Sequence, residues 1–326
     1  MLLLLSVFST ILGTSQNNFK MVVLGSGGGI DESNLSAYLL APANTDRYIC
    51  LDAGSLMHGI DVACAQGQFD NIEKTDQNSS LSANILHHHI DAYVISHPHL
   101  DHIMGMLMAA PFDNHKNIVC SPKTADALME HIFESPLWGN FTSEGTHPVG
   151  KWDIIRLADQ EWINIPNNSM KLKSFTLCHS CPNESNAFLI ENNDHYCLYF
   201  GDTGADKIEG QPKIENVFKS IKPLVQQNKL KAIFIEVSFP NDRDNHHLYG
   251  HLKPALLEEE LQKLAILISP KKTSAALQGV SIFITHIKPN YQTPQNSRDI
   301  IIRECEQMQH FGARFIYPKQ AEKYEF

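Results

Sequence analysis

The stretch that decides the fold reads His97-Pro98-His99-Leu100-Asp101-His102 and places three imidazoles and one carboxylate within six residues. An apolar run at residues 92–95 precedes it, and Gly105 with further apolar residues follows it. These flanks predict a buried strand that leads through the polar cluster into a helix. Nitrogen and oxygen ligands of this kind suit Zn²⁺, Mn²⁺ or Fe²⁺. The stretch therefore predicts a metal site at the end of a strand.

The spacing inside the cluster divides it between two metal ions. Residues two apart at a strand end face the same way, so His97 and His99 can share one ion. Asp101 and His102 follow as the helix begins, and they can turn toward a second ion. A histidine-rich loop with Asp101 as a helix N-cap is the alternative, but it leaves the matching flanks unexplained.

Other apolar runs also end in polar residues that bind metals. The runs that start at residues 172, 198 and 282 lead to His179, Asp202 and His286, respectively. A strand end gives a rigid base beside an open polar edge, so four such ends that meet on one rim would complete a metal site.

Short apolar runs of this type recur along the chain, with helical patterns between them. They predict an α/β fold in which two mixed sheets pack face to face with helices outside, an αββα sandwich. One domain is expected over residues 17–326. The expected strands are 21–24, 37–40, 48–51, 92–95, 171–177, 187–190, 197–200, 232–237 and 281–285. The expected helices are 102–109, 124–133, 214–227, 254–267 and 297–309.

The motif HxHxDH is the signature of the metallo-β-lactamase superfamily, and the longer string at residues 97–111 resembles that of the class-II cyclic-nucleotide phosphodiesterases. Ala110 is a departure, because the family usually carries Ser there. The resemblance covers most of the chain and implies hydrolysis of 3′,5′-cyclic nucleotides to 5′-nucleotides. The substrate would be cAMP first, with cGMP as the second candidate. Further similar blocks lie at residues 23–34, 51–55, 200–204, 235–239, 249–254 and 284–289.

The resemblance and the strand ends together imply two ligand sets that share Asp202 as a bridge. Two divalent ions, Zn²⁺ first and Mn²⁺ or Fe²⁺ as alternatives, would activate a hydroxide for attack on phosphorus. The expected sets are His97, His99, His179 and Asp202 for one ion, and Asp101, His102, Asp202 and His286 for the other.

A general acid is also needed, because the leaving 3′ oxygen takes up a proton. His251 is the candidate, with Glu236 to hold its imidazole in the cationic, donating form. This pair resembles the Glu and His of the tRNA 3′-processing enzymes. His251 could instead replace His286 as a metal ligand, but His286 directly ends an apolar strand. Asp101, as a ligand whose loss would stop turnover, is counted with the catalytic residues.

The glycine-rich segment at residues 25–29 resembles a phosphate-cradling loop but lacks the lysine of a P-loop. A tight turn beneath the metal site is the preferred interpretation, with backbone N–H groups near the substrate. The expected substrate contacts are Gly27, Gly28, Asn34, His58 and His247.

The composition and charge of the chain limit the kinds of partner that it can bind. The chain has 326 residues, is 43% hydrophobic and carries a formal net charge of −10. That length supports one large core. An acidic surface repels polyanions, so we expect no nucleic acid partner and a small cyclic nucleotide as substrate. A homodimer is compatible with the sequence.

Three other functions share parts of the pattern. A tRNA 3′ endonuclease would need a basic, Gly/Pro-rich arm, and the sequence between His179 and Glu236 contains none. Hydrolases of β-lactams or thioesters share the metal motif but lack the block around His251. A binding protein without activity would leave the intact ligand set unexplained.

Residues 1–13 are apolar and too short to span a bilayer as a helix. They resemble the core of a secretory signal, with a plausible cleavage zone at residues 13–16, although the first basic residue is Lys20. We expect a signal peptide over residues 1–16 and a periplasmic or secreted protein. A cytoplasmic protein is the alternative.

The seven cysteines are odd in number and irregular in spacing, which does not indicate a disulfide framework. Cys178 and Cys181 form the one close pair. A lone CxxC is weak evidence for a metal or redox site, so no role follows from it.

Overall fold

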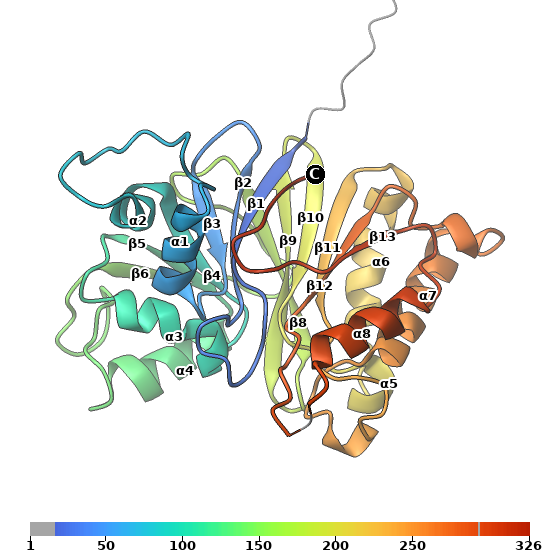
Figure 1. Cartoon of the computed structure of the whole chain (residues 1–326). Coiled ribbons are helices and arrows are strands. Elements are labelled where there is room, and N and C mark those ends of the chain that lie inside the picture. Colours follow the sequence, from blue (N-terminus) through green and yellow to red (C-terminus); the bar gives the residue numbers. More distant parts are fainter. Residues whose placement is uncertain (1–16, 293) are drawn as a thin grey trace, which may run out of the picture.

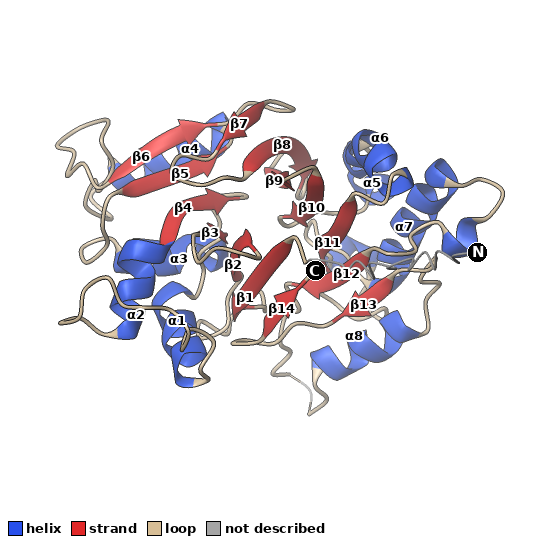
Figure 2. Ribbon diagram, turned by 90° about the horizontal axis from the view of Figure 1, so that it is seen from above, coloured by secondary structure: helices blue, strands red, loops and turns tan. Residues whose placement is uncertain are grey.

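The computed structural model describes residues 17–292 and 294–326, and the expected leader at residues 1–16 lies outside them. Two seven-stranded sheets face each other with helices on both outer sides (Figure 1), which confirms the predicted αββα sandwich. Figure 2, seen from above, shows the same layers and the two sheets meeting along β1, β2, β10 and β11.

The first sheet has the order β14-β1-β2-β3-β4-β5-β6. The strands from β14 to β3 pair antiparallel, whereas β3, β4, β5 and β6 pair parallel. Its strands are β1 (Phe19–Gly25), β2 (Ala37–Pro42), β3 (Tyr48–Leu51), β4 (Ile90–Ile95), β5 (Lys116–Cys120), β6 (Trp152–Arg156) and β14 (Lys323–Glu325).

The second sheet repeats this layout with the order β13-β12-β11-β10-β9-β8-β7. Here β10 to β13 pair parallel and β7 to β10 pair antiparallel. Its strands are β7 (Trp162–Asn164), β8 (Lys171–Cys178), β9 (Glu184–Asn192), β10 (His195–Phe200), β11 (Leu230–Glu236), β12 (Ser281–Thr285) and β13 (Arg314–Ile316).

Eight α-helices and short single turns connect the strands in the described part of the chain. The α-helices are α1 (Leu56–Ala65), α2 (Leu81–Asn84), α3 (Leu100–Ala109), α4 (Pro122–Leu128), α5 (Asp206–Glu209), α6 (Lys213–Gln226), α7 (Pro254–Ile268) and α8 (Ser297–Glu306). The short turns are Ile85–His89, Met129–Phe133, Asn245–His247 and Thr273–Ala275. Among these helices none is long and apolar enough to cross a membrane.

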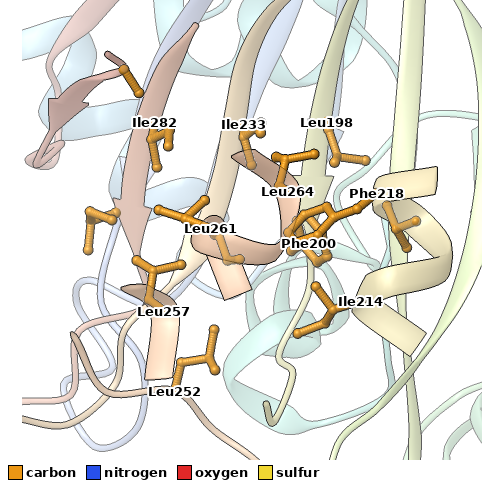
Figure 3. Close-up of a cluster of buried hydrophobic side chains, with 14 of the residues drawn as sticks. Leu198, Phe200, Ile214, Phe218, Ile233, Leu252, Leu257, Leu261, Leu264 and Ile282 are labelled. Atoms are coloured by element: carbon orange, nitrogen blue, oxygen red, sulfur yellow. The ribbon is translucent and has the colours of Figure 1, made fainter. Parts of the chain in front are cut away.

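Three apolar layers hold the sandwich together. Side chains between the sheets, such as Phe188 and Phe234, form the central layer, and almost every one of them is fully buried. A second layer lies between the first sheet and its helices. The third lies between the second sheet and its helices, where Phe218 packs against Phe200 and Leu264 lies beside Ile233 (Figure 3). Because each sheet is covered on both faces, its central strands read as continuous apolar runs.

The predicted strands lie within strands of the structure, except that 232–237 extends one residue past β11, and the predicted helices match to within a few residues. The helix predicted over 124–133 divides into α4 and the turn Met129–Phe133, and α8 ends at Glu306 rather than at residue 309. The strands β5, β6, β7, β13 and β14 and the helices α1, α2 and α5 were missed. All five strands lie at or next to a sheet edge, where short or polar sequence replaces the apolar pattern.

Candidate metal centre

The rim where β4, β8, β10 and β12 end carries the predicted ligands. His97 follows β4, His179 follows β8, and Asp202 follows β10, so one sheet supplies the first and the other sheet supplies the rest. Ligand atoms of His97, His99, His179 and Asp202 all lie within 4.8 Å of one another. The first predicted ligand set is therefore brought together by the fold.

The second predicted set is also assembled. Asp101 and His102 lie in the first turn of α3, Asp202 follows β10, and His286 follows β12. Their ligand atoms likewise lie within 4.8 Å of one another. His286 reaches its place with φ of 56°, a left-handed conformation that is unusual for a non-glycine residue.

Asp202 lies between the two sets. Its Oδ2 is 3.3 Å from Nε2 of both His102 and His286, and it is 3.7 and 3.9 Å from Nε2 of His97 and His179. Nitrogen atoms of both sets thus face one carboxylate oxygen. This is the arrangement that a carboxylate bridging two cations requires.

The donor atoms fit cations. Nε2 of the buried His97 has no hydrogen-bond partner, and such orphaned groups are costly unless something binds them. Nε2 of His102 faces Nε2 of His286 at 3.2 Å. Burial and the nearby His179 lower the pKa of His99 to about 4, which leaves its imidazole neutral near pH 7. Neutral imidazoles are the form that binds metal ions.

The pKa of Asp202 falls well below its usual range. Burial acts to raise it, but the imidazoles of His286 and His102 outweigh burial. Because a metal ligand must be deprotonated, this shift prepares the carboxylate for cations.

Asp52 orients His102 through the Nδ1 side of its ring. It directly follows β3, and its Oδ2 accepts hydrogen bonds from His102 Nδ1 at 2.8 Å and from Tyr199 Oη at 2.6 Å. Its two oxygens also accept from Ser96 N and Ser96 Oγ. A hydrogen bond on Nδ1 leaves Nε2 of His102 free for a metal.

Glu236 and His251 lie beside the second set as a buried pair. Oε1 of Glu236 is 2.8 Å from His251 Nδ1, and Ser238 Oγ donates to Oε2 of Glu236 while it also contacts His286 Nδ1. Burial and the nearby Asp202 raise the pKa of Glu236 to about 7, and burial lowers that of His251 to about 4. The predicted contact is present, but burial opposes a permanent imidazolium.

The glycine-rich segment supports the ligands rather than enclosing an anion. Gly28 packs so tightly against the His286 ring that any Cβ would overlap it. Gly29 N donates to Asp101 Oδ2 at 3.0 Å, and Asn34 Oδ1 accepts from Ser26 N to close the turn. Gly27 pairs through its backbone with the segment that follows His286. This matches the predicted tight turn.

The two histidines predicted to contact substrate lie in different places. His247 lines a groove of about 520 Å³ that begins beside the second ligand set. Lys288 Nζ in this groove is 4.0 Å from Asp101 Oδ2, and Phe239 contacts the His251 ring. His58 is exposed on α1 and is not among the residues that line the groove. The groove is lined mainly by Ile30, Phe239, Arg243, His247, Lys288 and Tyr291.

Three residues at the centre were missed from the sequence. Asp52 ends a strand just as Asp202 does, and that pattern could have identified it. Ser238 and Lys288 follow strand ends by only a few residues, but serine and lysine at such positions are common in any protein. Their roles become visible only through their contacts.

The model of the family described as class-II cAMP phosphodiesterases matches residues 18–318. A "probable 3′,5′-cyclic-nucleotide phosphodiesterase" of Yersinia pestis is 33% identical over 98% of this chain and 92% of its own length. A 3′,5′-cyclic-nucleotide phosphodiesterase of Aliivibrio fischeri is 32% identical over 99% and 96%. The solved structure of unliganded yeast PDE1 superposes with a TM-score of 0.80 at 22% identity and covers 95% of this chain and 100% of that one.

Replacing Asp52 by Asn tests its hold on His102. The variant keeps the volume but loses the negative charge and exchanges one acceptor oxygen for an NH₂ donor, so metal affinity should fall by about 10–100-fold. Zinc titration against a coloured chelator measures this affinity. Asp113→Asn is the matched control, because Asp113 is a buried carboxylate that bonds Tyr93 and Trp152 outside the centre. Equal effects of both substitutions on metal affinity would contradict the orienting role.

Proposed function

The chain belongs to the class-II cAMP phosphodiesterases and hydrolyses 3′,5′-cyclic nucleotides, and we propose that it does so at the two ligand sets joined by Asp202. The observation that carries this proposal is Asp202 Oδ2, which faces imidazole nitrogens of both sets. cAMP is the substrate we propose first, and the product is the 5′-nucleotide.

The proposed ligands are those predicted from the sequence. His97, His99 and His179 would hold one divalent ion, and Asp202 would bridge to the other. Zn²⁺ is the proposed metal, because the donors are imidazole nitrogens and carboxylate oxygens. When bound, two such ions lower the pKa of water toward neutrality and neutralise charge on phosphoryl oxygens. Asp101, His102 and His286 would complete the second position.

Lys288 is proposed to bind the phosphodiester. Its ammonium group lies within 4.0 Å of Asp101 and also lines the groove, so it can reach an anion held beside the second ion. The nucleoside would then extend along the groove toward Arg243 and His247. Arg243 stacks over Phe239 at 4.8 Å, which gives the groove a flat wall suited to a base.

His251 is proposed to protonate the leaving 3′ oxygen. Its Nδ1 is held by Glu236, which leaves Nε2 for the substrate. The low pKa caused by burial favours release of a proton once the imidazole carries one. Glu236, whose pKa is raised to about 7, can supply and recover that proton within the pair.

A tRNA 3′ endonuclease remains the second candidate, because human short-form tRNase Z shares the fold with a TM-score of 0.52 at 14% identity. Between His179 and Glu236 the chain forms β9, β10, α5, α6 and β11, which pack in the sandwich and leave no room for a tRNA-binding arm. A nuclease assay on precursor tRNA separates the two functions.

Export is proposed from the apolar leader and from a disulfide between Cys178 and Cys181, since disulfides persist in oxidising compartments. Fractionation of cells that express the full chain tests it.

The homodimer stays a prediction, and the mass of the protein in solution checks it.

Substitution of Asp101 or His99 by Ala should abolish hydrolysis of cAMP. Each variant removes a proposed ligand, so the rate should fall by at least about 10³-fold, on the scale of losing one electrostatic contact to the transition state. Product 5′-AMP is quantified by chromatography, and bound metal by elemental analysis. The exposed Asp61→Ala on α1 serves as control. A wild-type rate in either ligand variant would exclude metal-dependent hydrolysis at this centre.

His251→Ala should lower kcat by about 10²–10⁴-fold while both metal ions remain bound. A substrate with a nitrophenolate leaving group should be much less affected, because that group leaves without a proton. Metal content and kcat for both substrates are measured, with the half-buried His195→Ala as control. If the variant lost one ion instead, His251 would be a ligand rather than the acid.

Lys288→Met should raise KM for cAMP by roughly tenfold or more, since a hydrogen bond to a charged group contributes about 1.5–3 kcal/mol. Lys288→Arg should restore part of the affinity, and Lys219→Met, on the exposed side of α6, should change nothing. An unchanged KM in Lys288→Met would show that the phosphodiester binds elsewhere.

A further inference from the structure

The ligand His179 lies inside a small ring closed by a disulfide. β8 ends at Cys178, β9 begins at Glu184, and residues 179–183 form the turn between these antiparallel strands. A disulfide joins Cys178 to Cys181. The first turn residue after the strand is therefore both the predicted ligand and a member of the ring.

The ring is packed directly against the rest of the centre. Gly250 O accepts a hydrogen bond from His179 Nδ1 at 2.8 Å, and a Cβ at Gly250 would overlap the backbone at Ser180. On the other side, the Cys178 carbonyl accepts from Gly204 N and from Thr203 Oγ1, next to Asp202. A shift of this turn would thus displace His179 and disturb the segments that carry His251 and Asp202.

Hydrogen bonds also hold the turn: Asn183 O accepts from His179 N, and Ser180 O accepts from Asn183 N, both at 3.1 Å. Ser180 has φ of 56°, a conformation that a non-glycine residue adopts only when its surroundings impose it. The Glu209 carboxylate accepts from Ser180 N at 3.3 Å and from Cys181 N at 2.8 Å. Cys181 itself is exposed. The disulfide adds a covalent constraint to these hydrogen bonds.

The two sulfur atoms differ in access. Cys178 is 2% exposed, whereas Cys181 is on the surface. A thiolate in solution can therefore reach the disulfide from the Cys181 side. Of the five cysteines outside the pair, Cys50, Cys120, Cys197 and Cys305 are buried and Cys64 is half-buried.

We propose that Cys178–Cys181 is a reversible redox site that sets the metal affinity of the first ligand set through His179. Oxidation of the pair assembles the first metal position, and reduction releases the turn and weakens it. The inference rests on the proposed metal-binding role of His179. A chain that is still reduced would hold its first ion weakly, and it would gain the ion on reaching an oxidising compartment.

The chemical step is thiol–disulfide exchange with a dithiol. One thiolate of the dithiol attacks Cys181 Sγ, and the Cys178 sulfur leaves with the electron pair of the broken bond. The second thiol of the reagent then closes its own disulfide and releases Cys181. Two electrons and two protons pass to the cysteine pair, and the dithiol ends oxidised.

The test compares Zn²⁺ affinity in the two redox states of the full chain. Protein oxidised in air and protein reduced with dithiothreitol, then desalted without oxygen, are titrated with Zn²⁺ against a coloured chelator. The first-site affinity should fall by about tenfold or more on reduction, as when a group that orients a ligand is lost. It should recover on reoxidation. Circular dichroism checks that the reduced chain stays folded.

The double variant Cys178→Ser/Cys181→Ser is the matched control. It should have the low affinity of the reduced chain whether or not it is treated with dithiothreitol, while Cys64→Ser should respond as the wild type does. Equal Zn²⁺ affinity in both states of the wild type would overturn the proposal, as would maleimide labelling of both cysteines in the air-oxidised protein. Redox-dependent Zn²⁺ binding without cAMP hydrolysis would instead refute the proposed function and support this inference.

Discussion

The structure depends on one buried carboxylate oxygen surrounded by imidazole nitrogens. Asp202 Oδ2 lies within 3.9 Å of Nε2 on His97, His102, His179 and His286. Burial of so many polar groups is costly unless each finds a partner, and cations between them would supply that partner. The sandwich holds these groups at one rim. They come from segments that are far apart in the sequence, so no single local segment could bring them together.

Two facing sheets bring these distant residues together at one rim. β4 from the first sheet and β8, β10 and β12 from the second end at the same rim, so each strand contributes its next polar residues to a common site. The strands themselves carry none of the chemistry and are free to be uniformly apolar. This separation explains why the strand runs and the ligand clusters are so clearly distinct along the chain.

Contacts with neighbouring residues orient the candidate ligands. Asp52 fixes which nitrogen of His102 faces inward, the carbonyl of Gly250 does the same for His179, and Gly28 makes room for the His286 ring. Glycine matters at positions 28 and 250 because a side chain would occupy space that the ligands already fill. The shape of the centre thus depends on the close approach of the backbone at these glycines as well as on the ligand side chains. The disulfide beside His179 adds a covalent element to the same framework.

The sequence by itself determined the metal motif, the central strands and the αββα class, because ligands adjacent in sequence and apolar strand periodicity are local properties. It also indicated His179, Asp202 and His286, since each follows a strand. Only the tertiary structure decided what depends on distant segments: Asp52 behind His102, the groove beside Lys288, and the closure of the cysteine pair. Edge strands such as β6 and β14 escaped prediction for the same reason, because their place is fixed by neighbours rather than by their own pattern.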